Sequence, residues 1–359
     1  MIQDIESLAT IGMVGAHGNP GANAGSNTTF NPQFDSAVTS ANDAVDVVFD
    51  SVTTRNSNDA VTRDDGTDLN TFSQNRGILD LSGFATMNIT TQGEASTLAA
   101  IVTGDDTNTL NVEGDSGLTV FGDLDDSVST IAAGDMTGGL SLDAGGVAVN
   151  EADTNFEATT GSGGDSIDLS MIGGMNASKA DATITVSTGA GDDTVTGPGL
   201  SDVADSDFAG TLDLDGGDGQ DTLALAIGGT TSNDQSDFQT LDTVTFTNFE
   251  IVDLTFNGSG GTANGEFDGS VLDGLSEVVL TPDDNTNDFE LTNAAGTNRI
   301  TVNNGLIVSD VNTSVNPADT INDVTVSDFT GDTFTLALSG TNGFDADTGG
   351  GSGTANALS

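Results

Sequence analysis

Three aspartates recur at a fixed interval of 28 residues, each inside a glycine-rich turn. They are Asp165, Asp193 and Asp221. The last belongs to a nine-residue pattern, Gly-Gly-x-Gly-x-Asp-x-apolar-x, which spans 216–224 without a mismatch. The two earlier copies have threonine in place of the leading glycine. Because the chain is rich in glycine and aspartate, one match carries little weight, but three copies at equal spacing indicate a structural repeat.

These turns contain the oxygen ligands that calcium prefers. Glycine allows tight turns with positive φ, which aim backbone carbonyl groups inward. Aspartate adds a charged oxygen on a short side chain, and calcium accepts about six to eight oxygens in flexible geometry. The apolar residue two positions after each aspartate begins a strand and is expected to point into the core. The chemistry predicted here is therefore Ca²⁺ binding, with ordinary Asp-Gly turns as the structural alternative.

The nonapeptides resemble those of the RTX family of secreted calcium-binding proteins, in particular RTX-bearing bacterial surface-layer proteins. The resemblance is specific over 160–224. The copies stand singly here, whereas the family has them in tandem, so ligand sharing between coils does not follow directly. The metal ligands that the resemblance implies are Gly161, Gly163, Asp165, Gly189, Gly191, Asp193, Gly216, Gly217, Gly219 and Asp221.

The elements that must position these turns are short strands. Apolar and polar residues alternate in segments such as 183–186, 212–215 and 223–227, and again in 243–246, 300–302, 324–326 and 334–338. Such alternation is typical of half-buried strands. A second internal similarity relates 249–255 to 275–281, and aligning Glu250 with Glu277 gives an interval of 27 residues. We predict an all-β fold of parallel β-solenoid or β-roll-like coils, with β-sandwich strands as an addition or an alternative.

The chain divides by composition into three parts. We predict an N-terminal extended or assembly segment at 1–60, a β-rich calcium-binding solenoid-like domain at 61–339, and a flexible Gly/Ser/Asp tail at 340–359. The tail is a candidate export signal, an expectation that rests on the resemblance alone. Residues 1–15 carry Asp4 and Glu6 but no basic residue, so they do not predict an N-terminal secretory signal peptide.

The charge of the chain limits its partners. The formal net charge is −51, with 56 acidic residues against five Lys and Arg. This field excludes nucleic acid and anionic membranes as partners, and no apolar run is long enough to span a bilayer. Only nine of the acids are glutamates. The excess of aspartate favours turn-borne ligands over a general acidic coat, although a halophilic surface protein remains an alternative.

Catalytic chemistry has little support in the sequence. There is no cysteine, tryptophan or tyrosine, and the single histidine, His17, cannot form a histidine metal site. The five basic residues are scattered, so a lyase or epimerase site is not expected. We predict no enzyme. The expected function is that of an extracellular structural protein that binds calcium and assembles with itself into a surface layer or filament. The resemblance to the RTX family implies export by a type I-like route.

Two further functions and one further partner stay open at this stage. Rows of Thr-x-Thr, at 183–185 and 243–245, also suit an RTX-type adhesin or an ice-binding module. Cell-surface polysaccharide is a second candidate partner beside the homopolymer.

Overall fold

The fold was analysed in a computed structural model of the chain. The structure describes residues 11–14, 29–30, 44–52, 77–104, 107–147, 155–170, 182–198, 210–227, 243–256, 265–281, 287–293, 296–297, 299–303, 306–307, 320–326 and 335–339. The tail at 340–359 lies outside these residues.

The chain forms a parallel β-solenoid, which confirms the predicted fold class. Successive strands alternate between two sheets, and every pairing between the described strands is parallel. The antiparallel sandwich is therefore not the arrangement of these strands. Each coil stacks on the one before, so that it buries its apolar side chains against its neighbours. Among the described residues, no helix has the length and apolar character needed to cross a membrane.

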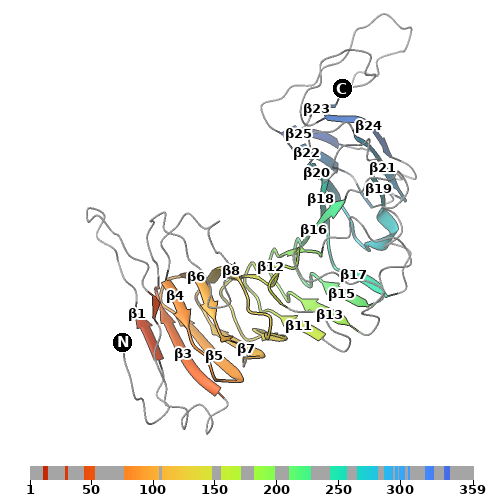
Figure 1. The fold of residues 1–359 in the computed structure, drawn as a ribbon. Helices are drawn as coiled ribbons and strands as arrows, with labels where there is room; N and C mark the ends of the chain where they lie inside the picture. The colour runs from red at the N-terminus through yellow and green to blue at the C-terminus, as the bar shows by residue number, and fades with distance from the viewer. Residues whose placement is uncertain are drawn as a thin grey trace, which may run out of the picture.

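One wall is a nine-stranded sheet, seen along the lower side of Figure 1. Its strands, in spatial order, are β1 (Ile11–Val14), β3 (Ala44–Asp50), β5 (Thr86–Gln92), β7 (Thr109–Gly114), β9 (Thr130–Ala132), β11 (Asn155–Thr159), β13 (Thr183–Ser187), β15 (Thr211–Asp215) and β17 (Val244–Thr247).

The facing wall is a twelve-stranded sheet, called the long sheet below. Its strands are β2 (Thr29–Phe30), β4 (Gly77–Asp80), β6 (Ser96–Val102), β8 (Leu118–Asp123), β10 (Leu140–Asp143), β12 (Ser166–Asp168), β14 (Thr194–Thr196), β16 (Thr222–Ile227), β18 (Ile251–Phe256), β20 (Glu277–Thr281), β22 (Arg299–Asn303) and β25 (Thr335–Ser339).

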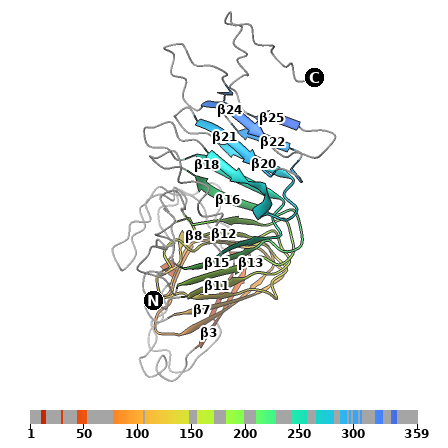
Figure 2. The same cartoon turned by 90° about the vertical axis from the view of Figure 1, so that its right-hand side faces the viewer.

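Beyond β17, a third sheet takes over as the partner of the long sheet. Its strands, in spatial order, are β19 (Gly265–Asp268), β21 (Asn287–Thr292), β24 (Thr320–Val326) and β23 (Leu306–Ile307), with a 3₁₀ turn, η3 (Gly269–Val271), after β19. The long sheet runs on without a break, and the stack of strands turns upward at this point in Figure 1. Figure 2 shows the same strands continuing as one column from β3 to β25.

The strand register confirms the 28-residue interval as one coil. Thr183 pairs with Asn155 on one side and with Thr211 on the other. The predicted 27-residue interval downstream is wrong. Ile251, not Glu250, pairs with Glu277, so this coil has 26 residues. A shift of one residue matters because it would move every side chain of the strand to the opposite face of the sheet.

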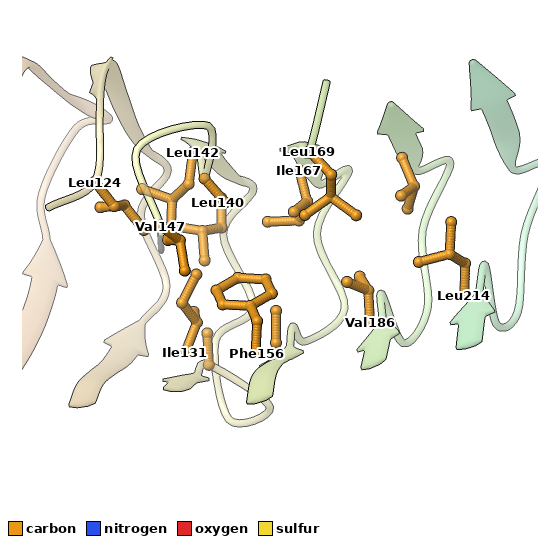
Figure 3. Packing of buried hydrophobic residues seen from close by; sticks show 14 of the residues in the cluster. Leu124, Ile131, Leu140, Leu142, Val147, Phe156, Ile167, Leu169, Val186 and Leu214 are labelled. Atoms are coloured by element: carbon orange, nitrogen blue, oxygen red, sulfur yellow. The ribbon is translucent and has the colours of Figure 1, made fainter. Parts of the chain in front are cut away.

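The core lies between the two walls. Figure 3 shows Ile131, Phe156, Val186 and Leu214 pointing from the nine-stranded sheet towards the long sheet, from which Leu140 points back. The inward-facing residues of the middle strands are fully buried or nearly so. Most outward residues of the same strands are threonine, serine, aspartate, asparagine or glutamate, with Phe121 and Ala132 among the exceptions. Burying alternate residues of a parallel stack in this way holds adjacent coils in a single register.

Candidate cation site at the corner before the long sheet

The three predicted aspartates share one position in successive coils. Each is the residue just before a strand of the long sheet, at the corner where the chain arrives from the nine-stranded sheet. We call this the corner row. Its members, from the N-terminal side, are Ser96, Leu118, Leu140, Asp165, Asp193, Asp221, Glu250 and Ser276.

The carboxylates in the corner row form a hydrogen-bonded ladder along the solenoid. The backbone N–H of Leu140 donates to Oδ1 of Asp165 at 2.7 Å. The N–H of Asp165 donates to Oδ1 of Asp193 at 2.7 Å, and that of Asp193 to Oδ1 of Asp221 at 2.8 Å. Oε2 of Glu250 accepts the N–H of Asp221 at 2.9 Å. Each acidic side chain thus satisfies one backbone donor of the preceding coil.

The second oxygen of each aspartate is buried without a hydrogen-bond partner. This holds for Oδ2 of Asp165, Asp193 and Asp221. The three residues are 3%, 1% and 0% exposed, so water does not reach these atoms freely. An unsatisfied buried oxygen costs about 1–3 kcal/mol, and more if it is charged. The ladder therefore provides a hydrogen-bond partner for only one of the two oxygens of each aspartate.

The hydroxyls of Thr160 and Thr188 lie close enough to Asp165 and Asp193 to lower the pKa of these carboxyls, against the larger effect of burial. Thr160 precedes Asp165 in the same turn, and its hydroxyl donates to the carbonyl oxygen of Thr188 at 2.8 Å. Thr188 in turn donates to the carbonyl oxygen of Gly216 at 2.7 Å. A hydroxyl has a single proton to donate. The short contacts of both hydroxyls go to carbonyl oxygens of the next coil, and Oδ2 of each aspartate has no hydrogen-bond partner.

The row carries like charges with no basic partner. Neighbouring parallel strands lie about 4.8 Å apart, so successive carboxylates are close. Among the described residues the one basic side chain is Arg299, whose Nε lies 3.1 Å from Glu277 in another coil. Burial raises the pKa of Asp165, Asp193 and Asp221. Burial raises the pKa of Asp221 to about 6; the N–H that Asp193 donates lowers it, and the charges of Asp193, Glu250 and Asp192 add smaller increases.

The glycines of the repeat are needed for steric reasons, whether or not an ion is bound. A Cβ on Gly219 would meet the carbonyl oxygen of Gly191, and a Cβ on Gly191 would meet that of Gly163. The turns are stacked so closely that no side chain fits between them. Gly189 and Gly217 also have positive φ, at +84° and +86°. The glycine positions are thus explained by packing, without a metal ion.

Several backbone carbonyls of these turns already accept hydrogen bonds between coils. The carbonyl of Gly161 accepts the N–H of Ala190 at 2.8 Å, and that of Gly189 accepts the N–H of Asp218 at 2.8 Å. A carbonyl oxygen has a second lone pair, so these bonds do not prevent it from coordinating an ion.

Glu250 is the member of the row that the nonapeptide pattern missed. Its side chain takes the place of the aspartate, but the glycine turn before it is absent. Thr247 pairs with Asp215, yet Glu250 follows Thr247 by three residues, whereas Asp221 follows Asp215 by six. The signal in the sequence is an acidic residue two positions before the buried Val252, as Asp221 is before the buried Leu223.

The donor set suits a hard cation only in part. Calcium binds hard oxygen ligands, and each aspartate turn has one carboxylate oxygen without a hydrogen-bond partner. However, within the described part of the chain no group of three or more His, Cys, Asp or Glu side chains is placed to hold a metal ion. An ion here would thus have to combine carboxylate oxygens of adjacent coils with backbone carbonyls. The residues that would hold it are Asp165, Asp193 and Asp221, with their glycine turns.

A second line of acids lies on the outer face of the long sheet. Asp143 pairs with Asp123 on one side and with Asp168 on the other. The pKa of Asp143 is raised to about 6, mainly by burial and also by the flanking Asp123 and Asp168 carboxylates, while the N–H of Gly145 lowers it. These side chains are only partly buried, and the N–H groups of Gly145 and Ser170 already donate to Asp143 and Asp168. This line therefore needs no bound ion to be explained.

The outer face of the nine-stranded sheet has a polar groove of about 670 Å³ over β3 to β9. A short amide ladder crosses it, since Nδ2 of Asn111 donates to Asn88 and Nδ2 of Asn88 donates to Asp46, both at 2.8 Å. Glu113 and Asp135 add acidic groups to its walls. The sequence contained no signal for this groove, because its residues come from separate coils.

Comparison with protein-family models, with curated proteins and with solved structures finds no match to this chain.

Proposed function

We propose that this protein is an extracellular structural protein whose solenoid is stabilised by calcium and which assembles with itself into a surface layer or filament. The observation that carries the proposal is the corner row of buried aspartates, each with one unpaired oxygen, at the interval of one coil.

The argument from the row is one of charge compensation. Ionised carboxylates buried side by side require protons or cations, because an isolated buried charge is costly. The described residues provide no basic side chain at the row. At neutral pH and in millimolar calcium, a divalent cation neutralises two carboxylates at once and supplies the partner that the Oδ2 atoms lack. This supports calcium over a purely structural role for the three turns.

The test is the dependence of folding on calcium. Because a ligand that binds only the folded state stabilises it, circular dichroism in excess chelator should show a lower melting temperature and less β structure than in calcium. Sodium chloride at the same ionic strength should not restore them. An unchanged melting curve in chelator would overturn calcium binding as the role of the row.

Self-assembly is supported by the architecture. A parallel solenoid grows by adding coils, and strand edges that are not covered are templates for another chain. A surface with a net charge of −51 opposes association unless cations bridge it. Light scattering and negative-stain microscopy across a calcium titration should show polymers in calcium and none in chelator. A folded protein that stays monomeric at high concentration in calcium contradicts this part of the proposal.

An adhesin is the second candidate, and the polar groove is the observation in its favour. Its volume lies in the usual range of ligand pockets, about 300–1,000 Å³, and its amides and carboxylates suit the hydroxyl groups of a polysaccharide. A glycan-binding screen tests this. The ice-binding alternative has less support, because the outward threonine row through Thr130 and Thr185 is interrupted by Glu157 and Asp213.

A further inference from the structure

We propose that Glu250 is a calcium ligand that, together with Asp221 of the third nonapeptide, forms a further cation site at the end of the corner row. This inference rests on the proposed calcium binding of the corner row and extends it by one site at its C-terminal end.

The geometry places two carboxylates in adjacent coils at this end. Oε2 of Glu250 accepts the N–H of Asp221 at 2.9 Å, which fixes the glutamate side chain against the aspartate. Oδ2 of Asp221 is buried and unpaired, and the residue is 0% exposed. The other oxygen of Glu250, Oε1, forms no hydrogen bond with the described residues and lies 3.8 Å from the position of a Cβ on Gly274. The carboxylate of Glu250 is thus held beside the residue whose Oδ2 is buried without a donor.

The choice of glutamate follows from the shortened turn. The chain covers the corner in three residues after Thr247, instead of the six between Asp215 and Asp221. Asn248 has φ +56° there, which allows the sharp change of direction without a glycine. A structural acceptor for the N–H of Asp221 does not have to be charged, as Ser96 shows by accepting the N–H of Val52 at 3.0 Å in the same row. A carboxylate at position 250 is thus more than the ladder needs.

The nature of the ligand follows from the donor atoms. Both free groups are hard, anionic oxygens, and the described residues around them include no nitrogen or sulfur ligand and no basic side chain. Calcium tolerates an irregular set of carboxylate and carbonyl oxygens, whereas magnesium requires nearly ideal octahedral geometry. The site accordingly suits calcium.

The experiment compares E250Q with the wild type and with D213N. Glutamine keeps the size and the acceptor for the N–H of Asp221 but removes the charge. Asp213 is exposed on β15, and D213N makes the same change of charge away from the row. Equilibrium dialysis with radioactive calcium, in about 0.15 M salt to screen the surface field, gives the number of bound ions and their affinity. Circular dichroism melting in chelator shows whether each variant folds; tryptophan and tyrosine fluorescence is no option, since the chain has neither.

We expect E250Q to bind one calcium ion fewer than the wild type, or to bind its weakest ion at least tenfold less tightly, while D213N matches the wild type. In chelator, E250Q should melt no lower than the wild type, because a charge next to Asp221 is gone. If the wild type binds calcium and E250Q binds it equally, Glu250 is only a structural acceptor and the inference fails alone. If the wild type binds no calcium, both this inference and the proposed function fail.

Discussion

The corner row is apolar in one part of the solenoid and acidic in the next. Leu118 and Leu140 are buried at 1% and 0% exposure, and Asp165 and Asp193 occupy the same row at 3% and 1%. The leucines are the first residues of β8 and β10, and the strand register aligns them with the aspartates just before β12 and β14. The same position in the fold is thus filled by side chains of opposite character.

The difference separates two ways of holding coils together. The leucine coils gain stability from apolar burial, which depends little on pH or on ions. The aspartate coils gain it from backbone hydrogen bonds to Oδ1, but they leave a charged oxygen unpaired in each coil. The folding of this second region should therefore depend on solution conditions, whereas that of the first should not. This is the behaviour that the following variants examine.

The largest effect is expected where the aspartate turns are most closely stacked. In Gly219→Ala the new Cβ would overlap the carbonyl oxygen of Gly191, so the two coils must separate. Overpacking typically costs about 1–3 kcal/mol and occasionally more, and an overlap with backbone, which cannot move aside like a side chain, belongs at the upper end. Gly134→Ala is the control, because its Cβ would meet only Thr159 Cγ2, at 3.6 Å. Calorimetric melting of both variants measures the contrast, and similar melting temperatures would show that the turns are not packed as described.

The second prediction concerns the apolar part of the row. Leu140→Ala should lower the free energy of unfolding by about 2–5 kcal/mol, since it leaves a cavity in the core shown in Figure 3. The backbone N–H that bonds Asp165 is retained. Denaturant unfolding should give the same loss in calcium and in chelator. If the loss in free energy of unfolding depends on calcium, the apolar and acidic regions do not differ in the way proposed.

Asp193→Asn should have an effect whose sign depends on calcium. Asparagine keeps an oxygen to accept the N–H of Asp165 but removes the buried charge. In chelator the variant should be more stable than the wild type by about 1 kcal/mol, and in millimolar calcium it should be less stable. D213N serves as the exposed control. If Asp193→Asn is destabilising by the same amount under both conditions, the aspartates act only as turn residues.

The last prediction concerns the pH dependence of the row without divalent cations. The pKa of Asp221 is about 6 in the folded protein, compared with 3.8 for an unperturbed aspartate. Between about pH 4 and pH 6 the folded state therefore binds more protons than the unfolded state, and stability falls as pH rises. Below about pH 4 the penalty is absent, and above about pH 6 it is complete.

The control for this pH profile is Asp221→Asn, measured by calorimetry in chelator. The rest of the acidic surface also makes the protein less stable as pH rises, so only the difference between the two profiles belongs to Asp221. That difference should grow from pH 4 to pH 6 in favour of the variant. Parallel profiles would mean that the carboxyl group is hydrated and not buried as the structure has it.

Much of the fold was determined by the sequence alone. Alternation of apolar and polar residues predicted β13, β15, β16, β17, β22, β24 and β25, because a strand with one buried face must alternate. The 28-residue spacing of Asp165, Asp193 and Asp221 predicted the coil, because equal turns stack only if the coils between them are equal in length. Composition also established that the chain has few basic residues that could pair with the acidic residues of the row.

Tertiary structure decided what the spacing left open. The register between Ile251 and Glu277 depends on how two strands align in the sheet. In the sequence, Glu250 was aligned with Glu277 because both are glutamates, and that alignment is off by one residue. Leu140 and Glu250 joined the corner row only through pairing, since the turns before them differ in length from those of the aspartates. Whether Oδ2 of Asp221 has a partner is likewise a property of the packed coils. Local sequence sets which residues can turn or alternate, but only the stacking of coils decides which of them meet.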